Sequence, residues 1–239
     1  MPTTDLTIET SDGPMPTYRA VPEGTAKGAI VVVQEAFGVT GHIEDVTRRL
    51  AGEGWLAIAP AFFHRQGSPV LGYTEFDKVM PVMAELTAEG FTEDLNASFD
   101  HLEREGFPAS RSGVVGFCMG GSVALVAGTL RPLGAAVTYY GGGVAEGRFG
   151  FPALVELAPT LSSPWLGHFG DLDKGIPVEQ VEALRAAAAR APVETAVFRY
   201  ADAEHGFNCD DRPDVYNAAA AGQAWVRTLD WFDAHVGAA

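Results

Sequence analysis

A cysteine at residue 118 lies at the centre of GFCMGG, residues 116–121, which directly follow the apolar run SGVV. Glycines two positions before and after a nucleophile are typical of a sharp turn between a strand and a helix, because larger neighbours would prevent the turn from closing. A helix beginning at Met119 would direct backbone N–H groups and its positive dipole end at the sulfur. The pattern predicts a catalytic thiol. A small buried cysteine beside glycines that serve packing is the competing interpretation.

Two further chemical groups follow, an acid in GDLDKGIP and a histidine in YADAEHGF. Asp173 and His205 each come just after an expected strand, and the order nucleophile, acid, histidine is that of the α/β-hydrolase triad. The histidine would take the thiol proton and return it to the leaving group, while the carboxylate fixes the imidazole tautomer and stabilises its cation. Asp171 is the alternative acid, and a surface or capping role is the alternative for His205.

A glutamate at residue 35 directly follows a buried strand in VVVQEAFGV, residues 31–39. In α/β-hydrolases the loop at this place supplies the second N–H group of the oxyanion hole. Ala36, Phe37 and Gly38 continue the loop here. Alternatively, Glu35 caps the following helix or faces solvent.

These motifs together make the sequence similar to the dienelactone hydrolase family, from residue 5 to residue 235. The resemblance is carried by QEAFGV, GFCMGG and HGFNCDDR, with GDLDKGIP in support. It implies that Cys118 is the nucleophile and that Asp173 and His205 complete the triad. The cysteine in place of the more usual serine is then the choice of the family itself.

The resemblance also implies roles for the residues beside the nucleophile. The backbone amides of Ala36 and Met119 would form the oxyanion hole. Glu35 would accept a hydrogen bond from the resting thiol. A carboxylate there disfavours the thiolate, so the sulfur would stay protonated until substrate displaces Glu35.

The sequence departs from the family pattern where the namesake enzyme grips a substrate carboxylate with two arginines. The position four residues after the histidine holds Cys209, and residues 67–90 contain no arginine and only Lys78. Arg212 could replace one arginine or lie at the surface. Phe37, Lys78 and Arg212 are the candidate substrate-binding side chains. We expect carboxylate-bearing lactones to gain little over neutral ones.

Alternating strand and helix signals must place these residues at one edge of a sheet. Strands are expected as a hairpin over 6–20 and at 29–34, 56–63, 112–117, 135–140, 164–170 and 194–200. Helices are expected at 43–54, at 92–106 with Thr92 as N-cap, after residue 118, from about Pro177, and at about 214–235. Alternation of this kind predicts a mainly parallel, doubly wound sheet of about eight strands with right-handed crossovers. The expected fold is a single α/β-hydrolase domain, residues 1–239, with ligands bound at the carboxyl ends of the strands.

The composition excludes several classes of partner. A formal charge of −15 argues against non-specific nucleic-acid binding and against anionic membrane surfaces. The N-terminus lacks the basic and apolar regions of a secretory signal, and no apolar run approaches the ~18 residues of a membrane span. Two cysteines in 239 residues do not make a disulfide framework, so a cytoplasmic setting is expected.

No metal or organic cofactor is expected. The histidines other than His205 show no paired ligand spacing, no G-x-G-x-x-G follows the first parallel strand, and GFCMGG lacks the lysine of a phosphate-binding loop. The expected partner is a small lactone or ester, acted on by a monomer or a homodimer.

Two functions of different class remain open from the sequence. The first is a hydrolase that cleaves a lactone, ester or thioester through an acyl-cysteine intermediate. The second is a non-catalytic protein that keeps the fold and binds a ligand or responds to oxidation at Cys118. The complete set of nucleophile, acid and histidine favours the hydrolase, because loss of function would remove some member.

Overall fold

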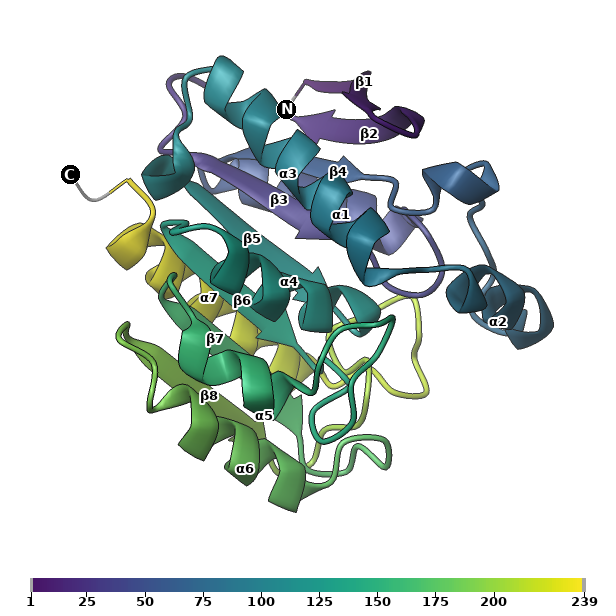
Figure 1. The fold of residues 1–239 in the computed structure, drawn as a ribbon, viewed down its shortest axis with the longest axis vertical. Helices are drawn as coiled ribbons and strands as arrows, with labels where there is room; N and C mark the ends of the chain where they lie inside the picture. Colours follow the sequence, from purple (N-terminus) through teal and green to yellow (C-terminus); the bar gives the residue numbers. More distant parts are fainter. Residues whose placement is uncertain (1, 238–239) are drawn as a thin grey trace.

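The structure, a computed structural model, describes residues 2–237 and is built on one eight-stranded sheet (Figure 1). The strands are β1 (Thr3–Thr10), β2 (Gly13–Ala20), β3 (Ala29–Val33), β4 (Leu56–Pro60), β5 (Ser112–Phe117), β6 (Ala135–Tyr139), β7 (Trp165–Gly170) and β8 (Thr195–Tyr200). Their order across the sheet is β1-β2-β4-β3-β5-β6-β7-β8. The hairpin of β1 and β2 joins β4 in antiparallel register, and every pair from β4 to β8 is parallel.

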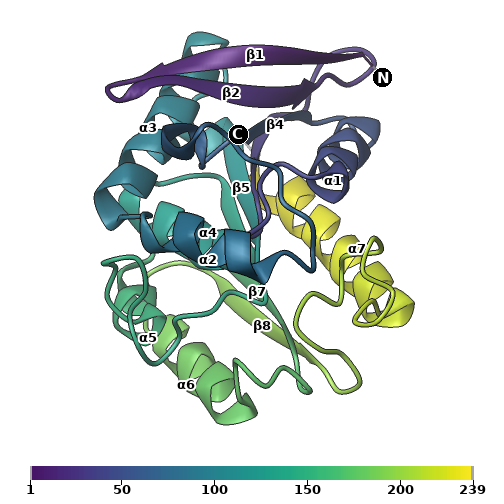
Figure 2. The same cartoon turned by 90° about the vertical axis from the view of Figure 1, so that its right-hand side faces the viewer.

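Helices cover both faces of the sheet. They are α1 (Gly41–Gly52), α2 (Phe76–Ala84), α3 (Ala88–Arg104), α4 (Met119–Leu130), α5 (Leu154–Leu157), α6 (Val178–Ala188) and α7 (Ala218–His235), with 3-10 turns η1 (His64–Gln66), η2 (Ala109–Arg111) and η3 (Ala158–Thr160). Helices α1 and α7 lie on one face, and α3 to α6 lie on the other (Figure 2). Helix α2 stands apart from both layers, at the right of Figure 1. Within residues 2–237, no helix combines the length and the apolar character that crossing a membrane requires.

The centre of the core is formed by strands that are covered on both faces. Every residue of β3 and of β5 is buried, which explains their continuous apolar sequences. These two strands pair in parallel with Val33 opposite Gly116, so the loops that follow them begin side by side at the same edge of the sheet. The loops after β7 and β8 leave from the same edge. The fold thus gathers all four predicted functional segments.

The predicted parallel sheet with a leading hairpin is confirmed. The predicted N-cap at Thr92 is wrong, because α3 begins at Ala88 and the Thr87 side chain accepts a hydrogen bond from Gly90 N at 3.1 Å. Thr92 instead lies inside the helix, where its hydroxyl donates to the Ala88 carbonyl at 2.7 Å. The last helix begins at Ala218 rather than at about residue 214. Helices α2 and α5 were not predicted.

Candidate active site

Cys118 occupies a strained turn between β5 and α4. Its backbone has φ 54° and ψ −116°, a positive φ that is rare for a residue with a side chain. A Cβ on Gly116 would overlap the backbone of Gly120, and a Cβ on Gly120 would overlap the Val33 and Gln34 carbonyls. The two glycines are therefore needed both for the turn and for the close approach of α4 to β3. The turn leaves Cys118 partly exposed at the carboxyl end of β5.

His205 and Asp173 meet at the same edge although the chain places 32 positions between them. His205 Nδ1 lies 2.6 Å from Asp173 Oδ2, and the other carboxylate oxygen accepts a hydrogen bond from Gly175 N at 2.8 Å. The Asp173 side chain is 2% exposed and that of His205 is 35% exposed. Asp171 instead makes a paired contact with Arg199 at 2.7 and 2.8 Å, which removes it from the histidine.

The imidazole of His205 is surrounded by groups that favour its cation. Burial opposes protonation, but the negative charge of Cys118 and hydrogen bonds to Asp173 and Cys118 outweigh it and raise the pKa of His205 to about 10. When the sulfur is ionised, the ring is therefore protonated at neutral pH. Such an ion pair supplies both a strong nucleophile and a proton for the leaving group.

Glu35 is buried, at 1% exposure, in the loop after β3. Its Oε1 accepts a hydrogen bond from the Tyr140 hydroxyl at 3.4 Å, and its Oε2 has no partner within residues 2–237. The hydrogen bond to the Cys118 thiol that the family resemblance implies is not made in this arrangement. Oε2 of this buried carboxylate can therefore still accept a hydrogen bond.

Tyr140 is a site residue that the sequence analysis missed. It is fully buried, has a positive φ of 39°, and its ring centroid lies 5.1 Å from that of His205. Burial, with the negative charges of Glu35, Cys209 and Cys118, holds its pKa well above the ordinary value, so the phenol remains a hydrogen-bond donor. Its position directly after β6 was the available signal, because the other site residues also follow strands.

The backbone amides of Ala36 and Met119 are free to bind an oxyanion. Ala36 is the third residue of the loop after β3, and Met119 is the first residue of α4, where a helix has no internal acceptor for the N–H group. Within the described part of the chain, neither N–H donates to a backbone carbonyl. Because β3 and β5 are neighbours, the two loops can present both amides to one oxygen.

Comparison with known proteins identifies the family of this chain. The model of the dienelactone hydrolase family matches residues 15–236. The chain belongs to the dienelactone hydrolase family. The resemblance inferred from its motifs is thereby confirmed.

Relatives in this family cover nearly the whole chain. A protein of Escherichia coli O157:H7, provisionally named carboxymethylenebutenolidase, is 37% identical over 99% of this chain and 83% of its own length. The carboxymethylenebutenolidase of Rhodococcus opacus is 28% identical over 93% of this chain and 87% of its own. A crystal structure of a Klebsiella pneumoniae protein, provisionally named dienelactone hydrolase, is 34% identical, covers 97% of this chain and 98% of that one, and superposes with a TM-score of 0.89.

Two of the three candidate substrate-binding side chains, Phe37 and Arg212, lie together at the loop that follows β3. Phe37 is buried, and the Arg212 guanidinium lies 5.8 Å from its ring centroid. A Cβ on Gly206 would lie 2.7 Å from Arg212 Nη1, so the guanidinium is also next to the loop of His205. Lys78 is exposed on α2 and pairs with Glu75, and no contact joins it to the triad.

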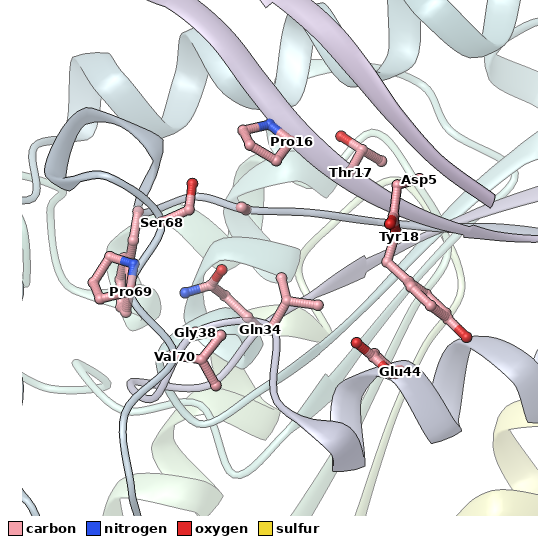
Figure 3. A pocket seen from close by; sticks show the side chains of 13 residues that line it. Asp5, Pro16, Thr17, Tyr18, Gln34, Gly38, Glu44, Ser68, Pro69 and Val70 are labelled. Atoms are coloured by element: carbon pink, nitrogen blue, oxygen red, sulfur yellow. The ribbon is translucent and has the colours of Figure 1, made fainter. Parts of the chain in front are cut away.

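A separate cavity of about 190 Å³ borders the loop after β3 (Figure 3). Its lining includes none of Cys118, Asp173 and His205. The residues that line it include Gln34, Gly38 and Val39 from the loop after β3, together with Tyr18 from β2 and Ser68 after η1. None of the residues that line the cavity forms a nucleophile–base pair, whereas His205 and Asp173 are hydrogen-bonded to each other. Among residues 2–237, no group of three or more His, Cys, Asp or Glu side chains is arranged to hold a metal ion.

Proposed function

We propose that this hydrolase cleaves a small lactone, ester or thioester through an acyl-cysteine intermediate. The observation that carries the proposal is the hydrogen bond of 2.6 Å between His205 and Asp173. The negative charge of Cys118 is among the causes that raise the pKa of His205, which puts the thiol near the imidazole. That set of partners supplies a base for the thiol, a fixed imidazole tautomer and a proton for the leaving group.

In the acylation half-reaction, the Cys118 thiolate attacks the substrate carbonyl and forms the carbon–sulfur bond. The N–H groups of Ala36 and Met119 bind the oxyanion that develops. The His205 imidazolium then gives its proton to the leaving oxygen or sulfur as its bond to the acyl carbon breaks. The N-terminus of α4 adds a favourable dipole at the oxyanion.

In the deacylation half-reaction, His205 removes a proton from water. The resulting hydroxide attacks the acyl-cysteine carbonyl, and the same amides bind the second oxyanion. The carbon–sulfur bond then breaks, the acid product leaves, and the Cys118 thiolate returns to its pairing with His205.

Glu35 regulates the nucleophile in this proposal. Its charge disfavours the thiolate, and its unpartnered Oε2 can accept the hydrogen bond of a resting thiol. In this structure the Tyr140 hydroxyl donates to Glu35 Oε1, and in the proposal the same bond holds the carboxylate away from the sulfur while substrate occupies the site. Cys118 is then free to pair with His205.

Arg212 gives the proposed substrate pocket one cation beside the triad. Phe37 forms the apolar wall of the pocket. Lys78 is paired with Glu75, so it does not serve as a second cation there. With one guanidinium in place of two arginines, we propose that a substrate carboxylate is tolerated and only modestly favoured. A preference above about 100-fold for carboxylate-bearing over neutral lactones, lost in Arg212→Ala, would contradict this, because it corresponds to about 2.7 kcal/mol from this one guanidinium.

The decisive experiment is turnover of p-nitrophenyl acetate, followed by a panel of lactones, aryl esters and thioesters. Wild type and Cys118→Ala are compared at equal concentration, with thermal unfolding as the check on the fold. We expect wild-type turnover that falls by at least about 10³-fold in the variant. Equal turnover in both would exclude the cysteine mechanism, and no turnover in either would favour a protein that only binds a ligand or senses oxidation through Cys118.

A further inference from the structure

Tyr73, in the segment between η1 and α2, contacts both loops that flank the candidate site. Its ring packs edge-on against Phe37, with centroids 4.8 Å apart. Its hydroxyl donates to Thr40 Oγ1 at 3.3 Å and accepts from Cys209 Sγ at 3.5 Å. Phe37 and Thr40 belong to the loop after β3, whereas Cys209 belongs to the loop of His205.

The hydrogen bonds of this side chain form a consistent donor chain. Burial, together with the charge of Glu35, raises the pKa of Cys209 to about 12, so its thiol keeps the proton that it donates to Tyr73. Burial also raises the pKa of Tyr73, so the phenol keeps the proton that it donates to Thr40. At neutral pH, Cys209 therefore donates its hydrogen bond to Tyr73, and Tyr73 donates its own to Thr40.

The ring of Tyr73 also supports Arg212. The guanidinium lies 5.7 Å from the Tyr73 centroid and 5.8 Å from that of Phe37, within the range of cation–π attraction. Arg212 follows His205 on the same loop. The ring therefore adds a second contact between the loop of the histidine and the loop of the oxyanion hole.

The segment that carries Tyr73 is itself docked on the oxyanion loop. Leu71 N donates to the Phe37 carbonyl at 2.9 Å, and the Pro69 carbonyl is so close to Gly38 that a side chain there would overlap it. Helix α2 beyond the segment buries only Val79 and Met83, so it contributes little anchoring. Tyr73 is consequently the residue through which the segment contacts the loop of His205.

We propose that Tyr73 is a positioning residue that holds the oxyanion-hole loop and the His205 loop in the mutual geometry that catalysis requires. The inference rests on the proposed function, because the amide of Ala36 and the imidazole of His205 must act on one substrate carbonyl. Small displacements of catalytic groups lower the rate steeply, so loosening this connection should reduce kcat. The effect is transmitted through Phe37 and Arg212.

The test compares Tyr73→Leu, Tyr73→Phe and a control, Phe76→Ala. Phe76 comes from the same region and lies 6.2 Å from the Phe37 ring, but it is 56% exposed and has no contact with the His205 loop. We expect Tyr73→Leu to lower kcat about 10- to 100-fold through lost ring contacts. Tyr73→Phe keeps the ring and should stay within about 5-fold of wild type, and Phe76→Ala within about 3-fold.

Thermal unfolding distinguishes positioning from loss of folded enzyme. We expect Tyr73→Leu to keep a cooperative transition well above the assay temperature. A kcat equal to that of Phe76→Ala in a folded Tyr73→Leu variant would overturn the proposal.

Amide hydrogen exchange tests the same idea without substrate. Tyr73→Leu should accelerate exchange in residues 36–40 and 206–212 together, whereas Phe76→Ala should not affect the second range. Acceleration confined to one range would overturn the inference. If wild type hydrolyses none of the compounds, the proposed function fails, and exchange still decides whether Tyr73 joins the loops.

Discussion

Two histidines in this protein have opposite protonation behaviour although both are hydrogen-bonded through their rings. His168 lies within β7, with Nδ1 at 3.0 Å from the Tyr200 hydroxyl and Nε2 at 3.2 Å from Thr228 Oγ1. Burial, with the nearby positive charge of Arg227, lowers its pKa to about 3. His205, just past the end of β8, has its pKa raised to about 10.

The difference between the two regions is the charge of the partners. The interior network around His168 uses neutral hydroxyls, which satisfy a neutral ring and offer nothing to stabilise a cation. The edge of the sheet gives His205 a carboxylate and an ionisable sulfur. Burial of a histidine therefore says little about function, whereas anionic partners at the carboxyl edge of a parallel sheet indicate proton transfer.

The comparison is tested most strongly by removing each histidine. His205→Ala should lower kcat for p-nitrophenyl acetate by about 10³- to 10⁴-fold, because no other group can move the thiol proton. Its fold should persist, since the side chain is 35% exposed. His168→Gln should instead lower the melting temperature and leave kcat within about 10-fold of wild type. A collapse of turnover in His168→Gln with normal stability would break the distinction.

The second test concerns two aspartates on one loop. Asp173→Asn should lower kcat about 10²- to 10⁴-fold, because the amide no longer fixes the imidazole tautomer or balances its charge. Asp171→Asn loses only its contact with Arg199, whose side chain is 31% exposed, and should change kcat less than about 3-fold. Steady-state kinetics of both variants decide the matter. A more severe loss in Asp171→Asn would show that the acid has been assigned incorrectly.

A third test follows from the lowered pKa of His168. The unfolded chain takes up this proton below about pH 6.5, whereas the folded protein resists it until about pH 3. Stability from the neutral ring is therefore present above pH 6.5 and is lost as the pH falls, by at most about 1.4 kcal/mol per pH unit. Urea unfolding between pH 6.5 and pH 4 should show a shallower pH slope in His168→Gln. Parallel slopes would mean that this histidine does not titrate differently on folding.

The smallest expected effect concerns Glu35. Iodoacetamide should label wild-type Cys118 slowly at neutral pH, and Glu35→Gln should label several-fold faster, because the opposing charge is gone. Peptide mapping distinguishes Cys118 from Cys209, which is fully buried and serves as the internal control. Rapid labelling of wild type already at about pH 5 would indicate a preformed ion pair and a purely structural Glu35.

Much of the site could be predicted from local sequence. The turn at Cys118 requires a glycine at residue 116, because a Cβ there would overlap the backbone of Gly120 only four residues later. The strands before Glu35 and Cys118 are continuous apolar runs, so their burial and parallel pairing were also predictable. These features depend on steric contacts between near neighbours and on hydrophobicity, and both can be read directly from the sequence.

The error at Thr92 shows where local signals are ambiguous. Thr87 and Thr92 both precede helical sequence, and the predicted helix began at the second of them. A threonine hydroxyl can cap a helix or bond back to the preceding turn, and it does the second here. Only the packed position of α3 selects between them.

By itself the sequence determined the glycine-flanked turn at Cys118, the chain order of Cys118, Asp173 and His205, and the strand ends that carry them, because these depend on neighbours along the chain. Only the tertiary structure decided between Asp173 and Asp171, since two residues on one loop differ in whether they meet His205 or Arg199. It also brought Tyr140 to Glu35 and Tyr73 to Cys209, contacts between residues 105 and 136 positions apart. Side chains that act across loops carry no local pattern, because their partners are set by how the strands pack into the sheet.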